Sequence, residues 1–130
     1  MDLTGTILEM LKKHEGKPVV SHTITRAIAQ SPEVCATHRS AIALRRSWGW
    51  SDEEIHKELQ LEIQIPVSYA IGKLKRNGLA LGVRIERGEK LKEQIKKKRI
   101  VFSNPRDLTL CTMAYRITNA GIKHMMSTKK

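Results

Sequence analysis

Lysine and arginine side chains gather in the last third of this sequence. The 130-residue chain carries 24 basic and 13 acidic side chains, a formal net charge of +11. Residues 81–130 carry 13 basic and 4 acidic side chains, whereas residues 1–50 are net +3 and residues 51–80 net −1. Such a field attracts polyanions and speeds their encounter. A solvated charged face is the plain alternative, but the size and asymmetry of the charge favour nucleic acid as the partner.

The positive charge is densest between residues 84 and 99, where eight cations face only three glutamates. Cations in this arrangement bind a phosphate backbone, which gives affinity and salt dependence rather than sequence choice. The eight are Arg84, Arg87, Lys90, Lys92, Lys96, Lys97, Lys98 and Arg99.

Patterns typical of catalysis or metal binding are weak. Cys35 and His38 have half of a zinc-site spacing, but Cys111 and His124 do not complete a known zinc pattern. The sequence has no Ser-His-Asp order, no glycine-rich phosphate loop and no HExxH motif. The acidic residues 52–54 are explained as the first turn of a helix. We therefore expect no enzyme activity, no metal and no cofactor.

Length and composition predict one compact domain, with at most a short extension. Hydrophobic residues make up 40% of the chain and aromatic residues 4%, so the core must be mainly aliphatic. No apolar run approaches the ~20 residues of a membrane span, and the N-terminus lacks a signal-peptide core. Two cysteines do not form a disulfide framework. We expect a soluble cytoplasmic protein, associated with the nucleoid and not with a membrane.

Apolar spacing and end signals predict a mostly helical chain. Ser31 and Ser51 are typical N-caps, and Gly78 is typical of a helix end. The predicted helices span residues 4–14, 23–30, 32–47, 51–60, 66–77 and 119 onward. Predicted strands span residues 79–86, 99–103 and 112–117. Residues 61–64 and 104–107 are predicted turns, and residues 88–98 fit a helix or a loop.

Two segments resemble MarR-like winged-helix regulators. Residues 67–79, VSYAIGKLKRNGL, are similar to the recognition helix and first wing strand of those regulators. Residues 115–121, YRITNAG, are similar to the closing wing strand and the next helix start. The predicted order of helix, turn, helix, glycine, strand, turn and strand agrees with a winged helix. The departure is the wing, because about 35 residues separate Gly78 from Tyr115, more than a hairpin requires.

The resemblance implies an α+β, mostly helical fold: a winged helix-turn-helix with an N-terminal helical extension and a long wing. The extension is residues 1–32, predicted to serve dimerisation. The winged-helix domain is residues 33–126, with the long basic wing over residues 81–117. Residues 127–130 are predicted to be a disordered tail. The helix over residues 35–47 would support the two that follow Trp50, although residues 23–47 could form a second helix-turn-helix.

The resemblance also implies sequence-specific binding of double-stranded DNA by a small prokaryotic or viral transcriptional regulator that acts as a homodimer. Its recognition helix would enter the major groove, and the basic wing would hold the DNA backbone. Tyr69 could instead pack at the helix edge. Binding of structured RNA, as in a ribosome-associated protein, and a winged-helix module that binds a protein partner are the alternatives. The outward-facing candidates are Ser68, Tyr69, Gly72, Lys73, Lys75 and Arg76.

Overall fold

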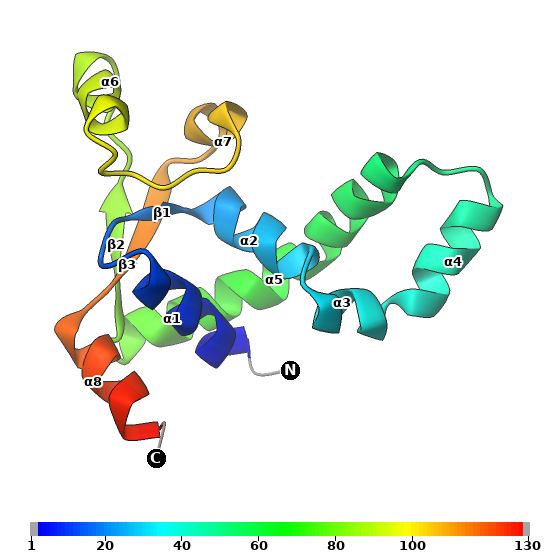
Figure 1. The fold of residues 1–130 in the computed structure, drawn as a ribbon, viewed down its shortest axis with the longest axis horizontal. Helices are drawn as coiled ribbons and strands as arrows, with labels where there is room; N and C mark the ends of the chain where they lie inside the picture. The colour runs from blue at the N-terminus through cyan, green and yellow to red at the C-terminus, as the bar shows by residue number, and fades with distance from the viewer. Residues whose placement is uncertain (1–2, 129–130) are drawn as a thin grey trace.

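The computed structural model describes residues 3–128 and is an α+β, mostly helical fold with one small antiparallel sheet (Figure 1). The helices are α1 (Leu3–Lys13), α2 (Ser21–Ala29), α3 (Pro32–Thr37), α4 (Arg39–Ser47), α5 (Asp52–Arg76), α6 (Glu89–Lys96), α7 (Pro105–Leu110) and α8 (Asn119–Thr128). The strands are β1 (Val19–Val20), β2 (Ala80–Arg84) and β3 (Met113–Ile117). None of the helices in this described part is both long and apolar enough to cross a membrane.

The sheet has β3 in its centre, in the order β1-β3-β2. Tyr115 of β3 lies opposite Val19 of β1 on one side and Gly82 of β2 on the other. A single parallel bridge joins Val101 to Val19. The strand predicted over residues 99–103 is reduced to this one bridge. The first and last thirds of the chain are therefore joined through this sheet.

The main core lies between α1, α2, the second half of α5 and one face of the sheet. Ile7 and Leu11 of α1 and Ile24 of α2 are fully buried there, with Val67 of α5 at 1% exposure. Residues 3–29 thus share one core with α5, and the apolar face of α1 is covered within the chain. Dimerisation through residues 1–32 stays a prediction, and residues 1–2 lie outside the described residues.

The turn predicted at residues 61–64 is wrong, because α5 is one continuous helix of 25 residues. Its apolar side chains repeat every four residues through the expected turn, so a single ridge packs along its length. Pro66 lies on the exposed side, where losing one backbone donor leaves the packed ridge intact. The ridge is Ile55, Leu59, Ile63, Val67 and Ile71, all buried.

The helix ends predicted from capping residues are confirmed. Ser31 accepts a hydrogen bond from Val34 N–H, and Ser51 forms a capping box with Glu54. At the end of α5, Gly78 has a φ of 72° and the Leu79 N–H bonds back to the Leu74 carbonyl at 2.9 Å. This left-handed glycine turns the chain directly from α5 into β2.

Residues 32–65 form a projecting hairpin, called here the arm (Figure 1). The single helix predicted over residues 32–47 is wrong, because α3 and α4 are separate helices that meet at His38. α4 runs opposite to the first half of α5, and Arg45 bridges them through Glu58 at 2.7 Å and Glu62 at 3.1 Å. The arm therefore stands between α2 and the second half of α5 in the chain, and the segment 35–47 does not support a helix pair after Trp50.

The strands predicted over residues 79–86 and 112–117 form as β2 and β3, but the residues between them are not a simple hairpin. They contain α6, which agrees with the helical alternative for residues 88–98, and α7, which replaces the turn predicted at residues 104–107. Ile85, Ile100 and Leu108 pack with Val20 and Ala114 in a second small core on the other face of the sheet. This core folds the insertion back onto β1.

The final helix is longer than predicted. α8 includes Ser127 and Thr128, which were assigned to the disordered tail, while residues 129–130 lie outside the described residues. Thr118 precedes α8, donates to the Gly78 carbonyl at 2.6 Å and accepts from the Gly121 N–H at 3.0 Å. A Cβ on Gly121 would lie 2.3 Å from the Leu79 carbonyl oxygen, so only glycine fits where α8 approaches Leu79, the residue before β2.

Candidate functional site

A groove of about 400 Å³ lies between the second half of α5, the start of α2 and the segment that joins α7 to β3. Three of the six helix residues predicted to bind, Ser68, Gly72 and Lys75, line it. His22 of α2 and Tyr115 of β3 contribute to the opposite walls. The groove therefore joins a helix face to the sheet, with hydroxyl, imidazole and ammonium groups along it.

Lys75 lies over the aromatic ring of Tyr115, with 5.8 Å between its Nζ and the ring centroid. Burial raises the pKa of the Tyr115 hydroxyl above its usual value, so the ring is neutral beneath the ammonium group. Gly82 lies beside Lys75 and Tyr115: a Cβ there would be 3.5 Å from Lys75 Cε, 3.4 Å from Tyr115 Cε1 and 2.9 Å from Met113 Cε. The glycine thus leaves room for the Met113 side chain, whereas the lysine stem would meet a Cβ at an ordinary contact distance.

Gly72 leaves the backbone of α5 without a side chain on the side that lines the groove. A Cβ built there would meet only Arg76 Nη1, at 3.6 Å. The absence of a side chain is therefore not required by packing within the chain. A glycine in a helix interior costs about 1 kcal/mol of helix stability relative to alanine. No packing contact among the described residues requires the glycine, so this cost is not compensated there.

The other predicted residues of α5 lie around its exposed surface. Tyr69 is 74% exposed, which rules out the alternative that it packs at the helix edge. Lys73 lines a different hollow, formed by α1 and α8 with Glu9 and His124 nearby. Arg76 is exposed one turn after Gly72. Lys73 is thus separated from the groove that Ser68, Gly72 and Lys75 share.

Some of the predicted wing cations are held by other groups of the insertion. The Arg87 guanidinium donates to the Leu108 carbonyl and, at 2.6 Å, to the Cys111 carbonyl, which fastens the end of α7. Lys97 pairs with Glu93 at 2.6 Å, and Lys92 lies 3.5 Å from Glu89. These pairs neutralise part of the charge on α6, although the side chains are solvent-exposed and the pairs are weak.

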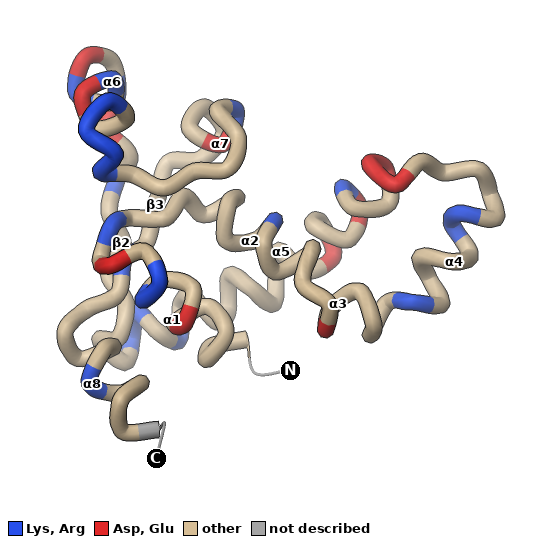
Figure 2. Tube along the Cα trace, in the orientation of Figure 1, with Lys and Arg blue, Asp and Glu red and all other residues tan. Residues whose placement is uncertain are grey.

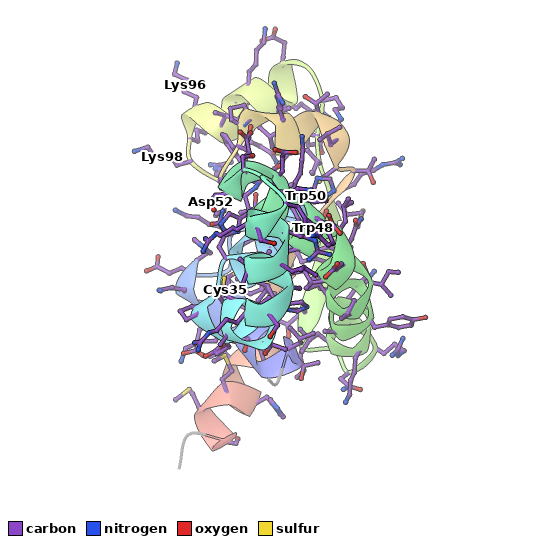
Figure 3. All side chains as sticks on the ribbon, turned by 90° about the vertical axis from the view of Figure 1, so that its right-hand side faces the viewer. Cys35, Trp48, Trp50, Asp52, Lys96 and Lys98 are labelled. Atoms are coloured by element: carbon purple, nitrogen blue, oxygen red, sulfur yellow. The ribbon has the colours of Figure 1, made fainter. Side chains whose placement is uncertain are left out.

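The remaining predicted wing cations make no ion pair within residues 3–128: Arg84, Lys90, Lys96, Lys98 and Arg99. Figure 2 shows basic residues concentrated along and after α6, and Figure 3 shows Lys96 and Lys98 extending into solvent on one side. Lys98 lines a hollow of about 350 Å³ with Lys13 and Lys17, away from the residues that line the groove. The basic surface is therefore broad, and it includes cations from the first 20 residues.

A buried ion pair fixes α7 against α2 and so holds one wall of the groove. Asp107 is fully buried and accepts from Arg26 at 2.6 and 2.8 Å and from Thr23 at 3.0 Å. Burial opposes ionisation of this carboxyl, but the hydrogen bonds from Arg26 and Thr23 outweigh it, and the Asp107 pKa lies below its usual value. The same hydrogen bond raises the pKa of Arg26. The pair is therefore ionised at neutral pH.

Sequence reasoning missed three residues that shape this site. Tyr115 was noticed only as part of a strand, and no pattern singled out His22. Asp107 falls in the turn predicted over residues 104–107 because Asn104-Pro105 is typical of a turn, whereas Asn104 caps α7. Within the described residues no three His, Cys, Asp or Glu side chains gather as a metal site would require.

No known protein family, curated protein or solved structure matches the chain.

Proposed function

We propose that this protein binds duplex DNA through the second half of α5, with the basic insertion between β2 and β3 holding the phosphate backbone. The single observation that carries the proposal is the groove, where an outward helix face with Ser68, Gly72 and Lys75 opens beside the sheet. The segment from residue 66 to residue 76 is about 16 Å long, at 1.5 Å per residue. A helix of this size fits the major groove of B-DNA.

Within this proposal the fold is a winged helix whose parts differ from those first assigned. The partner of the second half of α5 in the helix-turn-helix pair would be α2, since Ile24 and Ile28 share the main core with Val67 and Ile71, to which α1 also contributes. α1 and β1 precede this pair, and β2 and β3 follow it in the antiparallel sheet. The arm is then an insertion between the two helices of the pair, and α6 and α7 an insertion between the wing strands.

Each part of the interface has a distinct physical role. Ser68 and Tyr69, near the start of the exposed stretch, are placed for base edges, whereas Lys75 and Arg76 are placed for phosphates. The unpaired cations of the insertion supply affinity that falls with salt. The acidic tip of the arm, at residues 52–54, repels phosphate and stays away from the duplex.

The test removes the same charge from two places. In a fluorescence-anisotropy titration with labelled duplex DNA, Lys75→Ala/Arg76→Ala should weaken binding at least tenfold and reduce the salt slope by about 2. Lys57→Ala/Lys123→Ala, which removes two exposed cations from the arm and α8, should change affinity less than threefold. Equal losses in the two double variants would mean that only net charge matters, and the helix assignment would be abandoned.

A further inference from the structure

The hollow of about 350 Å³ between the end of α1 and the segment after α6 is called here the lysine hollow. Two backbone hydrogen bonds hold its two sides together. The Val101 N–H donates to the Pro18 carbonyl at 2.8 Å, and the Val20 N–H donates to the Val101 carbonyl at 3.0 Å. Residues 13–17 and 98–102, far apart in the chain, therefore share one concave surface.

Three lysines line this hollow: Lys13, Lys17 and Lys98. All three are exposed, and none of them makes an ion pair within residues 3–128. Glu15 is the acidic residue of the lining. Figure 2 shows the basic residues at the end of α1 and after α6 on the same side of the molecule, away from the arm. Because like charges in one hollow repel each other and attract counter-ions, this arrangement favours a bound anion.

Part of the wall of the lysine hollow is apolar. Ile100 is 8% exposed, and Val101 and Phe102 are half-buried. Apolar walls have a low dielectric constant and focus the field of nearby charges into a cleft. An anion in the hollow therefore interacts more strongly with the lysines than it would on an open surface.

The two turns that border the hollow each contain a non-glycine residue in the left-handed region. Glu15 has a φ of 56° and Lys98 a φ of 54°, and they are the only such non-glycine residues within residues 3–128. Lys98 follows the C-cap of α6, a position where glycine is usual, and its N–H donates to the Ile95 carbonyl at 3.1 Å. A left-handed backbone is unfavourable for a residue with a Cβ, so lysine weakens this helix end relative to glycine. Backbone costs of this kind concentrate at functional sites.

We propose that the lysine hollow binds a chain of linked phosphoryl groups, such as inorganic tripolyphosphate or the phosphates of a nucleoside triphosphate. Lysine ammonium groups bind phosphate oxygens as point charges. Three of them on two segments match successive anionic phosphoryl groups better than they match a single phosphate or carboxylate.

The size of the hollow favours a small ligand over a nucleic-acid duplex. Its volume of about 350 Å³ lies within the usual range of small-ligand sites, about 300–1,000 Å³. A duplex is a broad rod that rests on projecting cations, whereas a flexible phosphate chain can enter a hollow. The proposed site is separate from the groove beside α5 and does not depend on DNA binding there.

Isothermal titration calorimetry with sodium tripolyphosphate at constant ionic strength tests the proposal. The wild-type chain should bind it with a Kd on the order of 100 µM and should bind inorganic phosphate at least about tenfold more weakly. The largest NMR shifts of backbone amides should fall within residues 13–17 and 98–102. ATP distinguishes the two sources: an affinity equal to or below that for tripolyphosphate assigns the inorganic chain, and a tighter one assigns a nucleotide with its base against Phe102.

Paired charge variants locate the site. Lys13→Gln/Lys17→Gln should weaken tripolyphosphate binding at least about tenfold. Lys57→Gln/Lys123→Gln removes the same charge from exposed positions of the arm and α8, and should change the affinity less than about threefold. The affinity of Lys13→Gln/Lys17→Gln for duplex DNA should also change less than about threefold, since neither lysine belongs to the proposed DNA interface.

Two single substitutions separate binding from stability. Glu15→Gln should tighten tripolyphosphate binding by about twofold or more, because it removes the acidic side chain of the lining. Lys98→Gly should weaken binding and yet raise the melting temperature by roughly 2–4 °C, since glycine fits the left-handed position without cost. Circular dichroism of every variant checks that the helices are intact.

Three results would overturn the proposal. The first is an absence of binding to tripolyphosphate up to about 5 mM, where a site of the expected affinity would be saturated. The second is an equal loss in the two double variants, which would mean that tripolyphosphate responds to net charge alone. The third is a loss of duplex-DNA affinity in Lys13→Gln/Lys17→Gln as large as its loss of tripolyphosphate affinity, which would make the hollow part of the nucleic-acid contact.

Discussion

Replacing Gly72 with alanine should separate the stability of α5 from its use as a binding surface. The new Cβ meets only Arg76 Nη1, at 3.6 Å, which is an ordinary contact. The helix therefore gains the propensity difference between glycine and alanine, about 1 kcal/mol. For a chain of this size that gain raises the melting temperature by about 4 °C.

The same methyl group projects from the groove side of the helix, where the proposed duplex approaches. A methyl group placed in a close contact costs about 1–3 kcal/mol, so affinity for duplex DNA should fall at least about fivefold. Thermal unfolding followed by circular dichroism and anisotropy titration measure the two effects on one preparation. Ser40→Ala, at an exposed position of α4, is the control: it improves helix propensity without touching the groove.

Either of two results would refute this reasoning. A stabilised Gly72→Ala variant with unchanged affinity would show that nothing approaches this face of α5 closely. A destabilised variant would show that the space beside Gly72 is occupied, contrary to the geometry.

Three further predictions concern stability and ionisation. Gly121→Ala should lower the free energy of unfolding by about 2 kcal/mol or more in urea titrations, because its Cβ would lie 2.3 Å from the Leu79 oxygen; an unchanged midpoint would contradict the close approach of α8 to Leu79. Asp107→Asn should cost about 3–5 kcal/mol at pH 7 by leaving Arg26 unpaired. Because the folded-state pKa of Asp107 is lowered, its contribution is present above the unfolded pKa of about 3.9 and is lost as pH falls through the folded value. The stability difference between wild type and Asp107→Asn should therefore shrink below about pH 4, and a constant difference would contradict the ionised pair. Ser51→Ala should destabilise the start of α5 by about 1 kcal/mol. The Glu54 pKa is lowered by hydrogen bonds from the Ser51 backbone N–H and hydroxyl; the variant keeps the first and loses the second, so this pKa should rise part of the way in NMR titrations. An unmoved Glu54 pKa would exclude the hydrogen bond from the Ser51 hydroxyl.

The elements of this chain could be predicted wherever the signal is local. Caps at Ser31 and Ser51 and the glycine at position 78 each act within a few residues, and the structure has each of them. The alternation of apolar and other side chains after Gly78 likewise predicted β2. Signals of this kind depend on the chain's own backbone geometry and need no knowledge of distant partners.

The errors occurred where distant packing decides the outcome. The segment 61–64 was interpreted as a turn because Pro66 suits a helix start, yet the four-residue apolar spacing from Ile55 to Ile71 continues across it. Packing of that ridge outweighs the cost of one proline. Assigning residues 1–32 to an extension overlooked that Val19 and Val20 pair with β3, nearly a hundred residues later.

The candidate site was predictable only where it depends on local spacing within one helix. Ser68, Gly72 and Lys75 share one helix face, so their common exposure follows from spacing alone. Tyr115, His22 and the Asp107–Arg26 pair join them only through the tertiary fold. Arg87 is indistinguishable in sequence from the other cations of the insertion, although its guanidinium holds the end of α7.

The measurement that tests the central claim most directly is an anisotropy titration of the wild-type chain with random duplex DNA and with duplex RNA at two salt concentrations. The proposal predicts binding to DNA that weakens steeply as salt rises, with weaker binding to A-form RNA, whose narrow major groove does not admit a helix. No binding to either duplex at low salt, or a clear preference for the RNA, would contradict it.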